Sequence, residues 1–101
     1  MILKENPHNA VVRDLEDRLR QAHPRDEIFT DFEYGTPTKT VGQIDLYRIS
    51  ERGQWYFYEV KTGKKKIKKA QEQFDTFKQS FPEYPVKGVY VHPEYGVKRL
   101  K

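Results

Sequence analysis

The sequence of 101 residues contains no cysteine, which excludes disulfide bridges and thiolate metal sites and favours an intracellular protein. It has no apolar run near the roughly 18 residues of a membrane span, and the N-terminus lacks a signal-peptide pattern. It also has no glycine-rich phosphate loop, and its three histidines lack zinc-motif spacing. We therefore expect an intracellular protein without membrane association, with its histidines on the surface.

Charged residues are abundant, at 34%, and 14% of the residues are aromatic. This composition predicts one small domain over residues 1–101 with a largely aromatic core. The net charge of +4 is unevenly divided, because residues 1–63 carry a net −2 and residues 64–101 a net +6. Such one-sided basicity indicates a polyanionic partner, with a solvated basic face as the alternative.

Hydrophobic periodicity predicts an α/β fold, a small mixed sheet flanked by helices. Asn6 and Pro7 start a helix that runs to about Ala22, and Pro24 stops it. The remaining expected elements are strands at 27–34, 41–49 and 54–62, a helix at 64–80, a strand at 86–91 and a short edge strand at 95–100.

The segment of residues 42–71 carries the candidate chemistry. Asp45 lies on one strand of a predicted hairpin, and Glu59 and Lys61 share one face of the other. The turn is centred near residue 52, so residues 45 and 59 should lie opposite each other. Two adjacent carboxylates repel unless a cation lies between them, which suits Mg²⁺ or Mn²⁺. The alternative is a structural ion pair between Glu59 and Lys61.

Further residues complete this predicted metal site. The carbonyl of Val60 and the carboxylate of Glu16 are candidate ligands, because Glu16 lies on the buried stripe of the first helix. Pairing of Glu16 with Arg20 is the alternative interpretation. Gln71 is the polar residue on the stripe of the second helix, and we favour it over Gln73 as a residue that supports the metal ligands or contacts phosphate. The alternative is a partly exposed amide at the edge of the helix.

Such a site suggests metal-dependent phosphodiester hydrolysis, with Lys61 orienting the attacking water or stabilising the pentacovalent phosphate. A lysine run directly after it could hold nucleic-acid phosphates, whereas a nuclear-localisation signal is a weaker interpretation. The run comprises Lys64, Lys65, Lys66, Lys68 and Lys69.

The pattern Gly42-x-x-Asp45, Glu59-Val60-Lys61 and Gln71 resembles the PD-(D/E)XK nuclease superfamily. The predicted order of elements resembles its restriction-endonuclease-like αβββαβ core. GQIDL…YFYEVKTG is similar to archaeal Holliday junction resolvases, and EVK…AQEQF to the virus-type replication-repair nucleases. One departure is Ile44, which stands where the superfamily's name has proline.

The resemblance implies a Mg²⁺-dependent nuclease, with Asp45, Glu59 and Lys61 as its signature and Glu16 matching the first-helix carboxylate of several members. We expect an endonuclease acting on DNA, although the sequence leaves exonucleolytic attack open. The resemblance also implies a homodimer. The expected activity is that of a structure-specific or junction-resolving nuclease. The sequence leaves RNA open as substrate. Two alternatives remain: a nucleic-acid-binding module that has lost catalysis, and a small subunit whose partner recognises the substrate.

Overall fold

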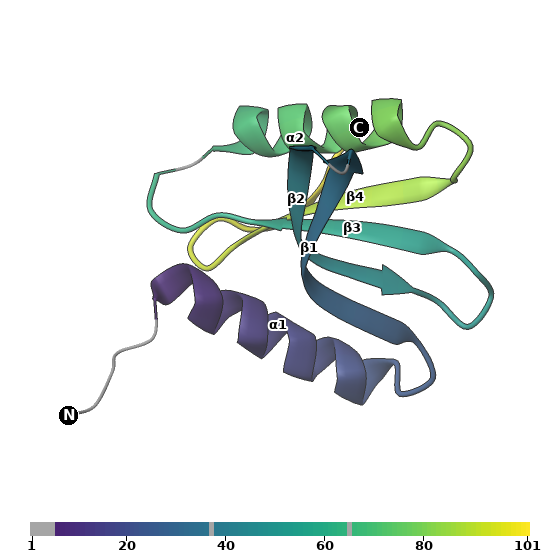
Figure 1. The fold of residues 1–101 in the computed structure, drawn as a ribbon. Helices are drawn as coiled ribbons and strands as arrows, with labels where there is room; N and C mark the ends of the chain where they lie inside the picture. The colour runs from purple at the N-terminus through teal and green to yellow at the C-terminus, as the bar shows by residue number, and fades with distance from the viewer. Residues whose placement is uncertain (1–5, 37, 65) are drawn as a thin grey trace.

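A computed structural model of the chain describes residues 6–36, 38–64 and 66–101, which form a mixed α/β fold (Figure 1). Two helices accompany a five-stranded mixed sheet with the strand order β1-β2-β3-β4-β5. In these ranges no helix is long and apolar enough to cross a lipid bilayer. The elements are α1 (Pro7–Ala22), β1 (Glu27–Thr36), β2 (Lys39–Ile49), β3 (Trp55–Val60), α2 (Ile67–Ser80), β4 (Val86–His92) and β5 (Gly96–Arg99).

The start of α1 follows from its first two residues. Asn6 caps the helix, since its side-chain oxygen accepts a hydrogen bond from the backbone N–H of His8 at 2.8 Å. Pro7 occupies the first helical position, where its missing N–H costs nothing. The predicted bounds of this helix are confirmed, although Ala22 is exposed and lies outside the buried stripe.

The sheet combines both kinds of strand pairing. β1, β2 and β3 are antiparallel neighbours, β3 and β4 are parallel, and β4 and β5 are antiparallel. The parallel pair requires a crossover connection, which α2 provides. Because β3 and β4 run in the same direction, their C-terminal ends meet at one edge of the sheet, near the N-terminus of α1 (Figure 1).

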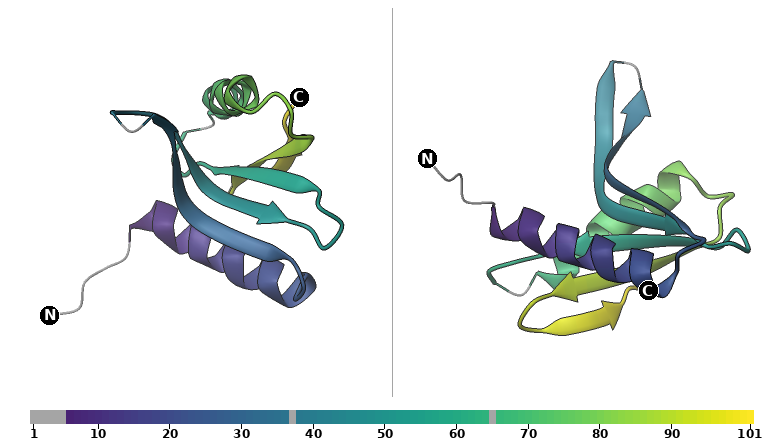
Figure 2. Two further views of the ribbon diagram at one scale, coloured as in Figure 1. Left: turned by 45° about the vertical axis from the view of Figure 1, so that its right-hand side comes forward. Right: turned by 90° about the horizontal axis from the view of Figure 1, so that it is seen from below.

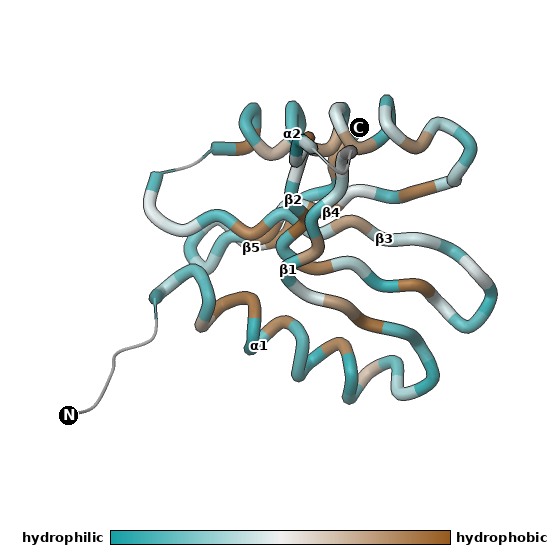
Figure 3. Tube along the Cα trace, viewed as in Figure 1, coloured by the Kyte–Doolittle hydropathy of each residue, from teal (hydrophilic) through white to brown (hydrophobic). Residues whose placement is uncertain are grey.

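The helices cover opposite faces of the sheet, as Figure 2 shows, and each face has its own hydrophobic core. On the α2 side, Phe57 of β3 packs with Phe74 and Phe77. On the α1 side, Tyr58 and Val60 of β3 pack with residues of the helix, whose apolar positions recur along its length in Figure 3. β3 is thus covered on both faces, as expected of a strand whose sequence is apolar on both sides.

The regular alternation of side chains between the two faces of a strand fails where β1 and β2 bend out of the sheet. Ile44 and Leu46 should share a face, yet Ile44 packs in the α2-side core and Leu46 in the α1-side core. Strand pairing passes from Thr30↔Leu46 to Phe32↔Ile44, and Asp31 between them has a φ of 54°. This irregularity turns the outer part of the hairpin towards α2 (Figure 1).

The second helix begins later than predicted, at Ile67 rather than at residue 64. Lys66 has a non-helical φ of −129° and no side-chain capping bond, and Gly63 has a φ of 86°. Lys64 and Lys66 therefore lie in the connection from β3, whereas Lys65 lies outside the described residues. Only the last two lysines of the run belong to the first turn of α2.

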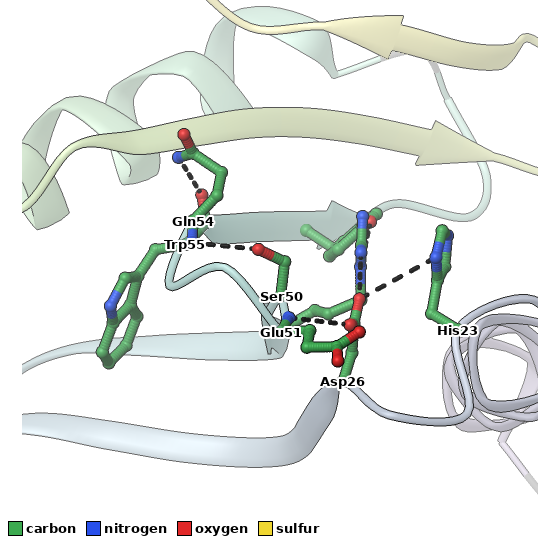
Figure 4. A network of polar contacts seen from close by, with 8 residues as sticks. His23, Asp26, Ser50, Glu51, Gln54 and Trp55 are labelled. Carbon is green, nitrogen blue, oxygen red and sulfur yellow. Dashed lines mark hydrogen bonds and ion pairs between the residues drawn. The ribbon is translucent and has the colours of Figure 1, made fainter.

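A polar network closes the end of the sheet opposite the strand ends described above (Figure 4). The carboxylate of Asp26 accepts hydrogen bonds from the guanidinium of Arg48 and from the N–H of Glu51. Arg48, which is 7% exposed, also donates to the Tyr58 hydroxyl and lies over the ring of Tyr56. The network ties the loop after α1 to the β2–β3 turn.

Candidate active site

Asp45 and Glu59 meet where β2 separates from β3. The pairing ends at Leu46↔Tyr58, and continuing this register brings Asp45 opposite Glu59, as the symmetry of the hairpin predicts. One carboxylate oxygen of Asp45 accepts a hydrogen bond from the backbone N–H of Val60 at 2.9 Å. The Asp45 side chain therefore takes the place of a backbone acceptor in the sheet, which fixes its position beside Glu59.

The electrostatics of Glu59 are unfavourable in the absence of a cation. Its side chain is 1% exposed, and burial followed by repulsion from Asp45 raises its pKa to about 8. The ammonium of Lys61 lies 3.6 Å from Oε2 of Glu59 and acts in the opposite direction, without outweighing these two effects. Within the described ranges, Oε1 of Glu59 is buried without a hydrogen-bond partner.

The first helix reaches this site through His8, which we expected to be a surface residue. Nε2 of His8 lies 3.2 Å from Oδ1 of Asp45, and the side chain is 34% exposed. The N-terminal end of a helix carries partial positive charge, so α1 presents both its dipole and the imidazole to Asp45. No sequence motif signals this contact, because it depends on where α1 crosses the sheet.

Glu16 is held elsewhere. Its carboxylate accepts two hydrogen bonds from Arg20, at 2.7 and 3.1 Å, which is the alternative pairing that the sequence suggested. Arg20 also donates to the carbonyl of Ile28, so the pair links α1 to β1. Glu16 lies eight residues after His8, or about 12 Å further along the helix. It is therefore not brought to Asp45 and Glu59.

The two glutamines of α2 have different surroundings. The side chain of Gln71 forms hydrogen bonds with both the N–H and the carbonyl of Lys101, at 2.9 and 2.8 Å, and with Asp75. It anchors the C-terminal residue to α2. Gln73 lies on the opposite flank of the buried stripe, and its buried Oε1 has no hydrogen-bond partner among the described residues. Of the two, Gln73 has the unused acceptor.

Tyr34 adds a phenol on the α2 side of the site. Burial, and secondarily the charge of Glu59, raises the pKa of this tyrosine. Its ring lies against Gly42, where a Cβ would collide with the phenol. The glycine of the Gly42-x-x-Asp45 pattern thus has a local reason, the close approach of Tyr34.

The lysines that follow Lys61 remain available for binding. Lys64, Lys66, Lys68 and Lys69 are exposed, and in the part of the chain that the structure describes none of them forms an ion pair. They follow Lys61 in the chain, and Lys61 itself lies beside the buried carboxyl of Glu59, which adjoins the partly buried Asp45. This arrangement can bind a polyanion and a cation together.

The donor set fits a hard divalent cation. Carboxylates of Asp45 and Glu59 lie together, and the carbonyl of Val60 should face Asp45, because its N–H does. Within residues 6–36, 38–64 and 66–101, no group of three or more His, Cys, Asp or Glu side chains could hold a metal. Two carboxylates suffice for Mg²⁺, which completes its coordination with water and substrate phosphates. The repulsion at Glu59 is what such a cation would relieve.

No protein-family model matches this sequence, and a search of curated proteins finds no match either.

Proposed function

We propose that this chain is a metal-dependent nuclease that hydrolyses phosphodiester bonds in DNA, with a restriction-endonuclease-like core. The observation that carries the proposal is that the buried carboxyl of Glu59 adjoins the partly buried carboxylate of Asp45 beside Lys61; burial, and secondarily repulsion from Asp45, raises the pKa of Glu59 to about 8. A structural ion pair between Glu59 and Lys61 would not need the second carboxylate of Asp45. A site in which Glu59 exchanges its proton for a divalent cation does need a second carboxylate to bind that cation.

Each group has a distinct role in the proposed reaction. Asp45, Glu59 and the Val60 carbonyl would hold Mg²⁺ or Mn²⁺, and the bound cation would lower the pKa of water and neutralise charge on the phosphate. The ammonium of Lys61 orients the attacking water or stabilises the oxygens of the pentacovalent phosphate. His8 holds the carboxylate of Asp45 in place. It gives α1 a residue at the site, a role for which the sequence predicted Glu16.

Substrate binding rests on the exposed lysines. Lys64, Lys66, Lys68 and Lys69, with Lys65 of the same run, would contact phosphates without reading bases, so binding should be insensitive to sequence and sensitive to salt. We propose a structure-specific endonuclease of junction-resolving type for this reason, since shape would supply the selectivity. RNA substrates belong in the same tests.

A cleavage panel tests the proposal directly. Linear duplex, single strand, flap and four-way junction DNA, with matching RNAs, are each incubated with Mg²⁺, Mn²⁺ or EDTA. Asp45→Asn and Lys61→Ala should abolish cutting, whereas the matched controls Asp17→Asn and Lys87→Ala, both at exposed positions, should not. Cutting that persists in Asp45→Asn would contradict the proposed metal site. Salt-sensitive binding without cutting would favour a non-catalytic module.

The oligomeric state decides how two strands are cut. We propose that two copies act together, as the resemblance to resolvases implies. Light scattering should give twice the monomer mass for the protein alone, and twice the monomer mass plus the mass of the DNA for the complex with a four-way junction. A monomer that cuts only one strand would contradict the dimer and favour the small-subunit alternative.

A further inference from the structure

His92 ends β4 at the same edge of the sheet as the candidate site, and it is buried, with 2% exposure. The sequence predicted a surface residue at this strand end, so the structure corrects that expectation. Its ring packs against Tyr95, with 4.5 Å between the ring centroids. A fully buried imidazole requires partners for both nitrogens.

Both nitrogens have partners, and these define the tautomer. Nδ1 accepts hydrogen bonds from the backbone N–H groups of Glu94 and Tyr95, at 3.0 and 3.3 Å. A nitrogen that accepts two N–H donors carries no proton, so the proton of the neutral ring is on Nε2. Nε2 lies 2.9 Å from the carbonyl oxygen of Gly63 and therefore donates to it.

These bonds connect two segments that are far apart in sequence. One is the turn between β4 and β5, and the other is the segment that leaves β3 just after Lys61. The N–H of Lys61 donates to the carbonyl of Val91 at 3.0 Å, so residues 61 and 63 are both tied to the end of β4. Gly63 has a φ of 86°, which turns the chain towards the exposed lysines.

We propose that His92 is a positioning residue for the candidate active site. Its imidazole fixes the backbone at Gly63 and thereby the placement of Lys61 and of the lysines that follow. This inference rests on the proposed nuclease function for its catalytic consequence. The tether itself can be tested without any activity.

Two substitutions separate the hydrogen bonds made by Nδ1 from the one made by Nε2. In His92→Asn the side-chain oxygen can replace Nδ1 as acceptor for the turn, but nothing replaces Nε2. In His92→Gln the amide nitrogen can reach the Gly63 carbonyl, but the acceptor at Nδ1 is lost. Ile28→Ala is the control, because it weakens the same core on the α1 side from β1, where Ile28 pairs with Arg48 at the opposite end of the sheet.

Nuclear magnetic resonance reads out the tether. In the wild type, Nε2 of His92 should carry the proton and show a scalar coupling through the hydrogen bond to the Gly63 carbonyl carbon. Backbone order parameters for residues 62–64 should fall from about 0.85 to below about 0.6 in His92→Asn, and stay high in His92→Gln and Ile28→Ala. Absence of the coupling, or equal order parameters in His92→Asn and Ile28→Ala, would overturn the tether.

Kinetics then test its consequence. At temperatures where each variant is folded, His92→Asn should lower kcat by up to about a hundred-fold, with a smaller change in KM, because a displacement of about 1 Å suffices for such a loss. His92→Gln should recover part of kcat, and Ile28→Ala should lower Tm with kcat unchanged. A folded His92→Asn with wild-type kcat would overturn the positioning role. A wild type that cuts nothing would refute the nuclease instead, and the order parameters would still decide the tether.

Discussion

Glu59 should make the metal-free protein less stable as the pH rises, which is the opposite of the usual behaviour of a carboxylate. Its pKa moves from 4.5 in the unfolded chain to about 8 in the folded one. Between these values the folded state binds the extra proton, so this contribution is complete below pH 4.5 and is lost as the pH rises through 8. The free energy of unfolding should fall by about 1.4 kcal/mol for each pH unit in this interval, roughly 5 kcal/mol in total.

Replacing Glu59 by glutamine removes the titration while keeping the size of the side chain. Urea unfolding followed through Trp55, the single tryptophan, should be measured from pH 5 to 8.5 in EDTA for both proteins. The variant should gain on the wild type by about 1.4 kcal/mol per pH unit. Other titrating groups are common to both proteins and cancel in the difference. A difference that stays constant over this range would refute the reasoning.

Metal should reverse this pH dependence. A cation can bind only when Glu59 has lost its proton, so Mg²⁺ or Mn²⁺ should stabilise the wild type increasingly from pH 6 to 8. At pH 7, binding should release about 0.9 proton, which calorimetry in two buffers of different ionisation enthalpy measures. Glu59→Gln should show neither effect. Metal stabilisation that is equal at pH 6 and pH 8 would contradict the shared site.

Three further substitutions test other parts of the structure. His8→Ala should lower kcat by about ten-fold or more, because His8 orients the proposed metal ligand Asp45, whereas Glu16→Gln should affect only stability. Equal kcat values for the two variants in cleavage assays would contradict the assignment of His8 to the site. Gly88→Ala should cost about 1–3 kcal/mol in urea unfolding, because the new Cβ meets the ring of Phe74, and a neutral change would contradict that contact. Arg48→Met should lower Tm. It should also weaken the loss of stability on acidification below pH 4, because the guanidinium of Arg48 lowers the pKa of Asp26 in the folded protein. An unchanged dependence of stability on acid pH would contradict the ion pair between Arg48 and Asp26.

Local patterns in the sequence were sufficient for most of the fold. Asn6 and Pro7 set the start of α1, and the two-sided apolar sequence of β3 indicated a central strand. The pairing of Asp45 with Glu59 was predictable too, because both are equally distant from the hairpin turn. These features depend on neighbours within a few residues or on the register of one hairpin, which a sequence shows directly.

Tertiary structure decided which residues complete the site. His8 and Glu16 share one face of α1, and only the position of the helix against the end of the sheet brings the first, not the second, to Asp45. His92 is buried because a turn and a segment almost thirty residues earlier meet around it. A periodic pattern gives the face on which a residue lies, but not the distance along that face to a partner. That distance is set by the packing of the two cores, which involves residues from the whole chain.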